Sequence, residues 1–203
     1  MKKIILFTTL LIALAMLVIF PMGMKAEASC DTLVTGDLPL QPNGFGECLT
    51  EYYTGEVLYQ YNADEKHEIA SMVKIMTANL IFEAIDEGKL GYDEMITVSP
   101  EASAMGGSQM FLDAGASYSV NDLLKGIIVV SANDASYAMA ERIAGSVDAF
   151  VGMMNEKASQ LGMNNTKFAN CTGLPSESEQ YSTARDVNIM TRSLMSHDKY
   201  FEY

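Results

Sequence analysis

A serine and a lysine three residues apart, Ser71 and Lys74, have the types and the spacing of an activated nucleophile. Lys74 is the only charged residue between Glu68 and Glu83, and its neighbours are mostly apolar. Residues three apart share one face of a helix, so the amine can reach the hydroxyl. Apolar surroundings lower the pKa of a lysine, which lets it accept a proton near neutral pH. The alternative is a helix-capping serine and a lysine whose ammonium reaches out to water.

A second polar pair, Ser131 and Asn133, follows the apolar run at residues 123–130. Where a buried helix ends, a serine and an asparagine two residues apart can point both polar groups into one cavity. The tripeptide by itself also fits a structural role, in which Ser131 ends one helix and Asn133 caps the next. The histidines are His67 and His197, and no Cys/His cluster has the spacing of metal ligands, so we expect no metal and no cofactor.

The pattern of apolar, polar and turn-forming residues predicts the elements that position these side chains. Two β-prone runs, residues 48–53 and 56–61, flank Thr54-Gly55 and predict an antiparallel hairpin. A helix that begins near Ser71 should be buried on several sides and end near Gly88 or Gly91. Further on we expect a short strand at 94–98, a short helix capped by Ser99, an extended stretch at 109–113, a turn at 115–119, and helices over 119–130, 133–143, 146–161 and 183–196.

The N-terminus has the organisation of an export signal. Met1-Lys2-Lys3 precedes an uncharged stretch, residues 4–20, and a small-x-small site ends at Ala28. We therefore expect residues 1–28 to be a signal peptide that is cleaved after export. An uncleaved membrane anchor is the alternative, because the uncharged stretch approaches the length that spans a bilayer. In both cases the rest of the chain would lie outside the cytoplasm.

The net charge of −13 makes the chain too acidic to bind nucleic acid through its general electrostatic field. Its three cysteines, Cys30, Cys48 and Cys171, are an odd number for an oxidising compartment. Cys30 and Cys48 could pair and leave Cys171 free, but the sequence alone does not decide this. Length and composition predict one domain or part of a larger one, with a loop-like lead-in at residues 29–45 and a folded body at 46–203.

Taken together, Ser71-x-x-Lys74 and Ser131-x-Asn133 in an exported chain resemble the D-alanyl-D-alanine carboxypeptidases, the low-molecular-mass penicillin-binding proteins. The resemblance extends from Glu51 to the C-terminus. The similar blocks are residues 55–59, 69–78, 107–112, 123–126, 131–135, 173–175 and 181–186. Because the order and spacing of the blocks also match, the chemical interpretation of both polar pairs is favoured over the capping interpretation.

The resemblance implies an α/β (α+β) fold of the β-lactamase/transpeptidase type, with an antiparallel sheet flanked by helices and a mainly helical subdomain. It implies that Ser71 attacks the carbonyl between the two terminal D-alanines of a peptidoglycan stem peptide, while Lys74 accepts its proton. Ser131 would relay a proton to the leaving amine, and Asn133 would bind the substrate amide or Lys74. β-Lactam antibiotics would acylate Ser71 as covalent inhibitors.

One motif of the resembled family is missing from this sequence. Family members carry Lys-Thr-Gly on a strand after Ser-x-Asn, whereas the lysines that follow Asn133 are Lys157, Lys167 and Lys199, none of which precedes Thr-Gly. The resemblance therefore implies an N-terminal portion of a carboxypeptidase domain, with an incomplete sheet whose edges are unpaired. We expect this chain alone to have little activity.

Two alternative functions stay open at this point. A class A-like β-lactamase shares the serine and the lysine, but its second motif usually has aspartate where this chain has Ala132. A non-catalytic wall-associated protein could retain the fold without the third motif.

Overall fold

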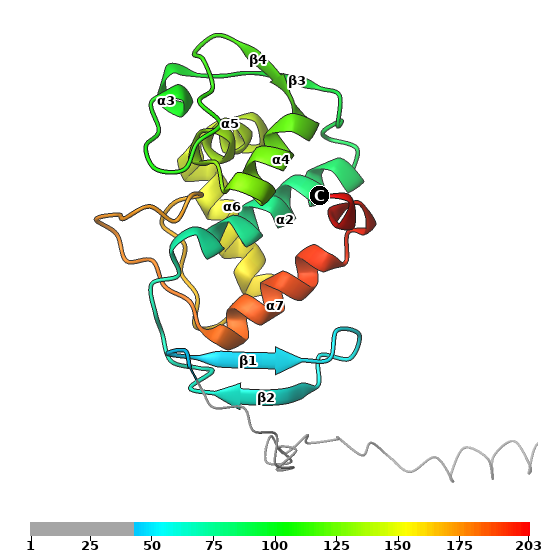
Figure 1. Cartoon of the computed structure of the whole chain (residues 1–203), viewed down its shortest axis with the longest axis vertical. Coiled ribbons are helices and arrows are strands. Elements are labelled where there is room, and N and C mark those ends of the chain that lie inside the picture. Colours follow the sequence, from blue (N-terminus) through cyan, green and yellow to red (C-terminus); the bar gives the residue numbers. More distant parts are fainter. Residues whose placement is uncertain (1–42) are drawn as a thin grey trace, which may run out of the picture. The chain divides into compact units, whose positions relative to one another are not determined.

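The computed structural model of the protein describes residues 43–203, which combine helices with short antiparallel strands (Figure 1). The predicted signal peptide, nearly all of the predicted lead-in and Cys30 lie outside these residues. The strands are β1 (Glu47–Thr50), β2 (Val57–Tyr61), β3 (Met95–Thr97) and β4 (Ser117–Ser119). The helices are η1 (Ala70–Met72), α2 (Val73–Asp86), α3 (Pro100–Ser103), α4 (Val120–Val130), α5 (Asn133–Ala144), α6 (Val147–Gln160), α7 (Ala184–Met195) and η2 (Asp198–Glu202), of which η1 and η2 are 3₁₀ helices.

Strands β1 and β2 form the predicted hairpin, with Cys48 opposite Gln60 in antiparallel register. Gly55 makes the connecting turn possible, because its φ of +74° lies in the left-handed region that glycine adopts without steric cost. Helix α7 packs on β1 (Figure 1), and there the Thr50 hydroxyl donates to Asn188 Oδ1 over 2.8 Å. The hairpin prediction is confirmed, and the hairpin is anchored to a helix more than a hundred residues further along the chain.

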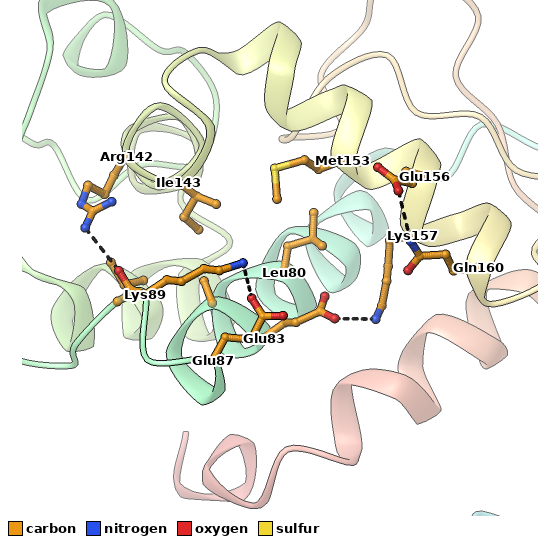
Figure 2. A pocket seen from close by; sticks show the side chains of 12 residues that line it. Leu80, Glu83, Glu87, Lys89, Arg142, Ile143, Met153, Glu156, Lys157 and Gln160 are labelled. Carbon is orange, nitrogen blue, oxygen red and sulfur yellow. Dashed lines mark hydrogen bonds and ion pairs between the residues drawn. The ribbon is translucent and has the colours of Figure 1, made fainter.

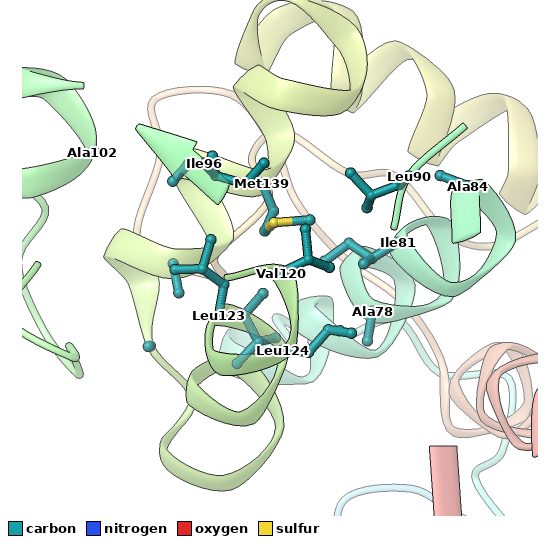
Figure 3. Close-up of a cluster of buried hydrophobic side chains, with 14 of the residues drawn as sticks. Ala78, Ile81, Ala84, Leu90, Ile96, Ala102, Val120, Leu123, Leu124 and Met139 are labelled. Carbon is teal, nitrogen blue, oxygen red and sulfur yellow. The ribbon is translucent and has the colours of Figure 1, made fainter. Parts of the chain in front are cut away.

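Helix α2 lies at the centre of the described fold and contacts α4, α5, α6 and α7 (Figure 1). Ten of its 14 residues are buried, which confirms the prediction of a helix buried on several sides. One apolar cluster lies between α2, α4, α5 and β3 and includes Ile81, Leu123 and Met139 (Figure 3). A second cluster lies between α2, α6 and α7 and includes Phe150 and Met190. The buried polar side chains on α2, those of Lys74, Thr77 and Asn79, therefore lie beside these apolar clusters.

The second sheet corrects one prediction. Residues 115–119 were expected to form a turn, but they contain β4, which pairs with β3 in antiparallel register. Only the start of the stretch turns, at Gly115, whose φ is +81° and whose N–H donates to Val98 O over 2.9 Å. The Ser-Tyr-Ser sequence of β4 lacks the run of β-branched residues that indicates a strand, so only its pairing with β3 reveals it.

The predicted helices are present, and side chains cap four of them at the N-terminus. In each of these four, a hydroxyl oxygen accepts a hydrogen bond from the backbone N–H three residues further on. The capping residues are Ser99, Ser119, Ser146 and Thr183. The sequence predicted the cap at Ser99, so both the helices and this starting point are confirmed.

Cys48 is half-buried and Cys171 is fully buried, and neither is in a disulfide bond with another of the described residues. The suggested pairing of Cys48 with Cys30 stays a prediction because it falls partly outside those residues. From residue 43 onward, none of the helices combines the length and the hydropathy that crossing a bilayer requires.

Candidate active site

Ser71 and Lys74 lie at the start of the central helix and contact each other. Ser71 is exposed in the 3₁₀ turn η1, directly before α2, and Lys74 is in the first turn of α2. Lys74 Nζ lies 3.2 Å from Ser71 Oγ and donates a second hydrogen bond to Thr172 O over 2.6 Å. The predicted contact between the two residues is thus confirmed. Ser71, however, lies in the 3₁₀ turn that directly precedes α2 and not in the first turn of the α-helix.

The surroundings of Lys74 explain how its amine can act as a base. The residue is only 5% exposed, so the alternative of an ammonium that reaches out to water is wrong. Burial lowers the pKa of Lys74 from 10.5 to about 8, since the charged form loses hydration. The neighbouring Cys171 acts in the opposite direction but less than burial does, and burial raises the pKa of its own thiol to about 12. A substantial fraction of Lys74 is therefore neutral at mildly alkaline pH.

The turn at residues 172–173, far along the chain, contacts both residues of this pair. Gly173 has φ +83°, and a Cβ built on it would lie 2.8 Å from Ser71 N and closer still to Ala70 O. Thr172 supplies the carbonyl that accepts from Lys74. The backbone of Thr172 and Gly173 therefore lies directly against both Lys74 and the peptide that carries Ser71, and only glycine leaves room for this approach.

Ser131 and Asn133 lie where α4 ends and α5 begins. Ser131 ends α4 in the left-handed conformation, with φ +58°, and Ala132 rather than Asn133 occupies the N-cap of α5. The alternative in which Asn133 caps the helix is therefore wrong. Asn133 Nδ2 instead donates to Gly106 O over 2.7 Å, and its backbone N–H donates to Ser108 O over 2.7 Å.

Two buried polar atoms at this junction have no hydrogen-bond partner among residues 43–203. They are Ser131 Oγ and Asn133 Oδ1. Buried polar groups are almost always hydrogen-bonded in folded proteins, so an unpaired hydroxyl and an unpaired amide oxygen indicate a place where a polar ligand or water binds. Both atoms belong to residues that the sequence identified as candidates.

The second pair is connected to the first through the loop at residues 106–112. A Cβ built on Gly107 would lie 2.7 Å from Asn133 Nδ2 and 3.4 Å from Leu174 Cδ2. Leu174 directly follows Gly173, which packs against the Ser71 peptide. The structure thus brings Asn133 next to the turn that holds the first pair, whereas Ser131 Oγ makes no hydrogen bond to Ser71 or Lys74.

Asp134 is a contributor that the sequence reasoning missed. Its carboxylate is 1% exposed and accepts from the N–H groups of Met110 at 3.0 Å and Leu112 at 3.1 Å. Between them, Phe111 takes φ +60° and is 81% exposed, which departs from the extended conformation predicted for 109–113. Asp134 therefore fixes the loop that holds Asn133, and no local sequence signal connects an aspartate to amides more than 20 residues earlier.

A separate cavity of about 430 Å³ lies between α2, α5 and α6 (Figure 2). Its three cations are paired: Lys157 with Glu83 at 2.8 Å, Lys89 with Glu87 at 2.6 Å and Arg142 with Glu94 at 2.5 Å. The residues lining it include none of the four candidate residues. Among the described residues, no group of His, Cys, Asp and Glu side chains is arranged to hold a metal ion.

Solved structures with the same arrangement define the class of fold. The D-alanyl-D-alanine carboxypeptidase DacD from Francisella tularensis superposes with a TM-score of 0.78 at 40% identity, covering 80% of this chain and 39% of that one. Penicillin binding protein 5 from Haemophilus influenzae gives a TM-score of 0.75 at 37% identity, covering 79% and 47%. The described residues therefore have the β-lactamase/transpeptidase-like fold, as the resemblance implied.

Sequence comparison then gives the family. The profile of the S11 peptidases, described as D-alanyl-D-alanine carboxypeptidase, matches residues 46–203, so this chain belongs to that family. It is 44% identical over 193 residues to D-alanyl-D-alanine carboxypeptidase DacF of Bacillus subtilis (strain 168), covering 95% of this chain and 48% of the relative. It is 42% identical over 161 residues to DacC of Escherichia coli (strain K12), covering 76% and 40%. The chain spans about half the length, or less, of these curated relatives.

Proposed function

We propose that this chain carries the acylating residues of a serine-type D-alanyl-D-alanine carboxypeptidase. Its substrate would be a peptidoglycan stem peptide that ends in D-Ala-D-Ala, and its role would lie in cell-wall metabolism and cell shape. The observation that supports this most strongly is the buried Lys74 amine, 3.2 Å from the exposed Ser71 hydroxyl and with a pKa lowered to about 8. Serine next to a neutral lysine is an activated nucleophile.

In the proposed reaction, Ser71 Oγ forms a bond to the carbonyl carbon between the two D-alanines as its proton passes to Lys74 Nζ. The C–N bond then breaks, and the terminal D-alanine leaves as an amine after taking up that proton, with Ser131 Oγ as relay. Asn133 Oδ1, which is buried and unpaired, would accept from a substrate amide N–H. Water finally hydrolyses the ester and restores Ser71. A β-lactam would acylate Ser71 in the same first step, but the amine released when its ring opens would remain covalently attached to the acyl group.

The place of action is a further part of the proposal. The basic start, the uncharged stretch at residues 4–20 and the small-x-small site ending at Ala28 support export of the chain. The protein would then act outside the cytoplasm, either free after cleavage of the signal or attached to the membrane through an uncleaved one.

Covalent labelling with a fluorescent penicillin tests the nucleophile directly. We expect a labelled band for the wild type and none for Ser71→Ala. Ser117→Ala, which removes an exposed hydroxyl from β4, is the matched control and should label like the wild type. Label that persists in Ser71→Ala would contradict the assignment of Ser71, and an unlabelled wild type that binds glycan or protein would support a non-catalytic wall-associated protein.

Turnover separates the carboxypeptidase from the class A-like β-lactamase. The sequence contains no Lys-Thr-Gly, so we expect D-alanine release from a pentapeptide by this chain alone to be slow even where Ser71 is labelled. Rapid, Ser71-dependent hydrolysis of nitrocefin would favour the β-lactamase instead. The alanine at position 132 argues against that outcome, because class A enzymes usually carry aspartate there.

A further inference from the structure

The turn at residues 170–174 contacts both members of the Ser71–Lys74 pair, although it lies about a hundred residues away in sequence. Thr172 O accepts from Lys74 Nζ over 2.6 Å, and Gly173 packs against the peptide before Ser71. A displacement of this turn would change the position of the hydroxyl and of the amine at the same time. The residue that fixes the turn therefore controls the geometry of the pair.

The Asn170 side chain fixes this turn with four hydrogen bonds. Its Oδ1 accepts from Gly173 N at 2.7 Å and from Thr172 N and Thr172 Oγ1, both at 3.1 Å. Its Nδ2 donates to Leu174 O over 2.8 Å. An asparagine that bonds to backbone groups two and three residues on stabilises a specific turn conformation. Both the oxygen and the nitrogen of this amide are thus used to hold backbone rather than to contact a ligand.

The turn is also anchored at its start, so the backbone that carries the Asn170 side chain is itself held in place. Asn170 N donates to Gln180 Oε1 over 3.1 Å, and the Thr77 hydroxyl of α2 donates to Cys171 O over 2.8 Å. These two contacts do not involve residues 172–174. The Asn170 side-chain amide holds that segment instead. The Thr172 carbonyl is consequently presented to Lys74 from a rigid backbone.

We propose, on the basis of the function proposed above, that Asn170 is a positioning residue. It excludes water from the Lys74 amine and orients the lone pair of that amine toward the Ser71 hydroxyl. A neutral amine has two N–H bonds and one lone pair. When Thr172 O holds one N–H bond, rotation about the terminal C–N bond is restricted and the lone pair can face the Ser71 hydroxyl. Without the Asn170 brace, Thr172 moves, water reaches Lys74 Nζ, and the amine regains its hydration and its proton.

The test is an NMR titration of the protein labelled with ¹³C-lysine, in which the Lys74 side-chain signal is assigned by its loss in Lys74→Arg. The wild-type signal should titrate near pH 8, as the pKa of Lys74 indicates. In Asn170→Ala the midpoint should rise by about one pH unit or more toward that of a hydrated lysine. Asn170→Ser, whose hydroxyl can bond the same amides more weakly, should fall between the two.

Asn155→Ala is the matched control. Asn155 also braces the backbone through three hydrogen bonds, with Val151 O at 3.0 Å, Phe168 O at 2.9 Å and Phe168 N at 2.9 Å, and none of these partners is Thr172 or Lys74. Its removal should lower stability without moving the titration midpoint. A purely structural role for Asn170 would give the same result for both asparagines.

An unchanged midpoint in both Asn170 variants, or an equal shift in Asn155→Ala, would overturn the proposal. Should Asn170→Ala not fold, Asn170→Ser decides, because a partial shift is expected there. The titration needs neither substrate nor penicillin, so its outcome is independent of labelling at Ser71. If the wild type is not labelled by penicillin but the Asn170 variants shift the midpoint, only the proposed function is contradicted. If the wild type is labelled but the Asn170 variants leave the midpoint unchanged, only the role of Asn170 is contradicted.

Discussion

Replacing Gly173 with alanine should damage both the stability and the chemistry of the protein, because this residue lies against the Ser71 peptide. Its φ of +83° is unfavourable for alanine, and its new Cβ would lie 2.8 Å from Ser71 N and closer still to Ala70 O. Distances under 3.0 Å are essentially never seen for a real Cβ, and backbone atoms cannot rotate away as a flexible side chain can. The 170–174 turn and the Ala70–Ser71 peptide must therefore move apart.

Gly88→Ala separates the two contributions to this cost. Gly88 follows α2 with φ +71°, and no atom lies within 4 Å of a Cβ built there. The left-handed conformation alone should destabilise that variant by about 1 kcal/mol. Gly173→Ala has the same conformational cost, and the steric overlap should add about 1–3 kcal/mol. The difference between the two variants thus measures how tightly the turn packs on the Ser71 peptide.

Urea unfolding followed by far-UV circular dichroism measures both variants, and it suits a chain that has no tryptophan. Penicillin labelling of the same samples should slow by about tenfold or more in Gly173→Ala, since a movement of an ångström at the nucleophile is enough for such an effect. Gly88→Ala should label at the wild-type rate. Equal losses of stability in the two variants would refute the reasoning, because the predicted overlap would then have no energetic effect.

Three further substitutions test other features of the site. The free energy of unfolding of the wild type, measured in urea, should rise by about 3 kcal/mol relative to that of Lys74→Met between pH 7 and pH 10.5. The folded wild type loses its Lys74 proton near pH 8, whereas the unfolded chain keeps it up to about 10.5, so the wild type alone gains stability over that window. Asp134→Ala should cost about 2–4 kcal/mol and increase hydrogen exchange at the Met110 and Leu112 amides, which lose their acceptor. Phe111→Gly should raise stability by about 1 kcal/mol in a thermal melt, because the residue is 81% exposed and has φ +60°.

Features encoded by neighbouring residues could be predicted from the sequence. The hairpin around Gly55, the buried helix after Ser71 and the cap at Ser99 each depend on residue types within a few positions. The spacing of Ser71 and Lys74 likewise predicted their contact, because a single helical turn determines it. The four candidate residues came from the same kind of local pattern.

Features that depend on contacts across the chain could not be predicted in this way. The carbonyl that holds Lys74 is 98 residues from it in sequence, and the amides held by Asp134 precede it by 24 and 22 residues. Nothing in Asn170-Cys171-Thr172 indicates which helix its backbone will approach. Strand β4 was missed for the same reason, since its residues become a strand only beside β3.

Backbone strain is concentrated around the candidate site, where the Lys74 amine is also buried. Of the four non-glycine residues with positive φ among those described, three adjoin the candidate site: Ala70 before Ser71, Phe111 in the loop held by Asp134, and Ser131. Such conformations cost about 1–3 kcal/mol each and persist only where the surrounding structure fixes them. The exception, Asn62, has a residue type that tolerates the left-handed region.

Two of the three strained residues at the site have a hydrogen-bonded or tightly packed neighbour that holds them in place. Gly173 packs against the carbonyl of Ala70, and the Asp134 carboxylate accepts from the amides on both sides of Phe111. The desolvated Lys74 amine adds its own cost at neutral pH, since the folded state disfavours its charged form. Substitutions that relieve these local costs, such as Lys74→Met at neutral pH or Phe111→Gly, are therefore expected to act on stability and on acylation in opposite directions. A variant that became both more stable and faster to acylate would show that the strain is incidental to the chemistry.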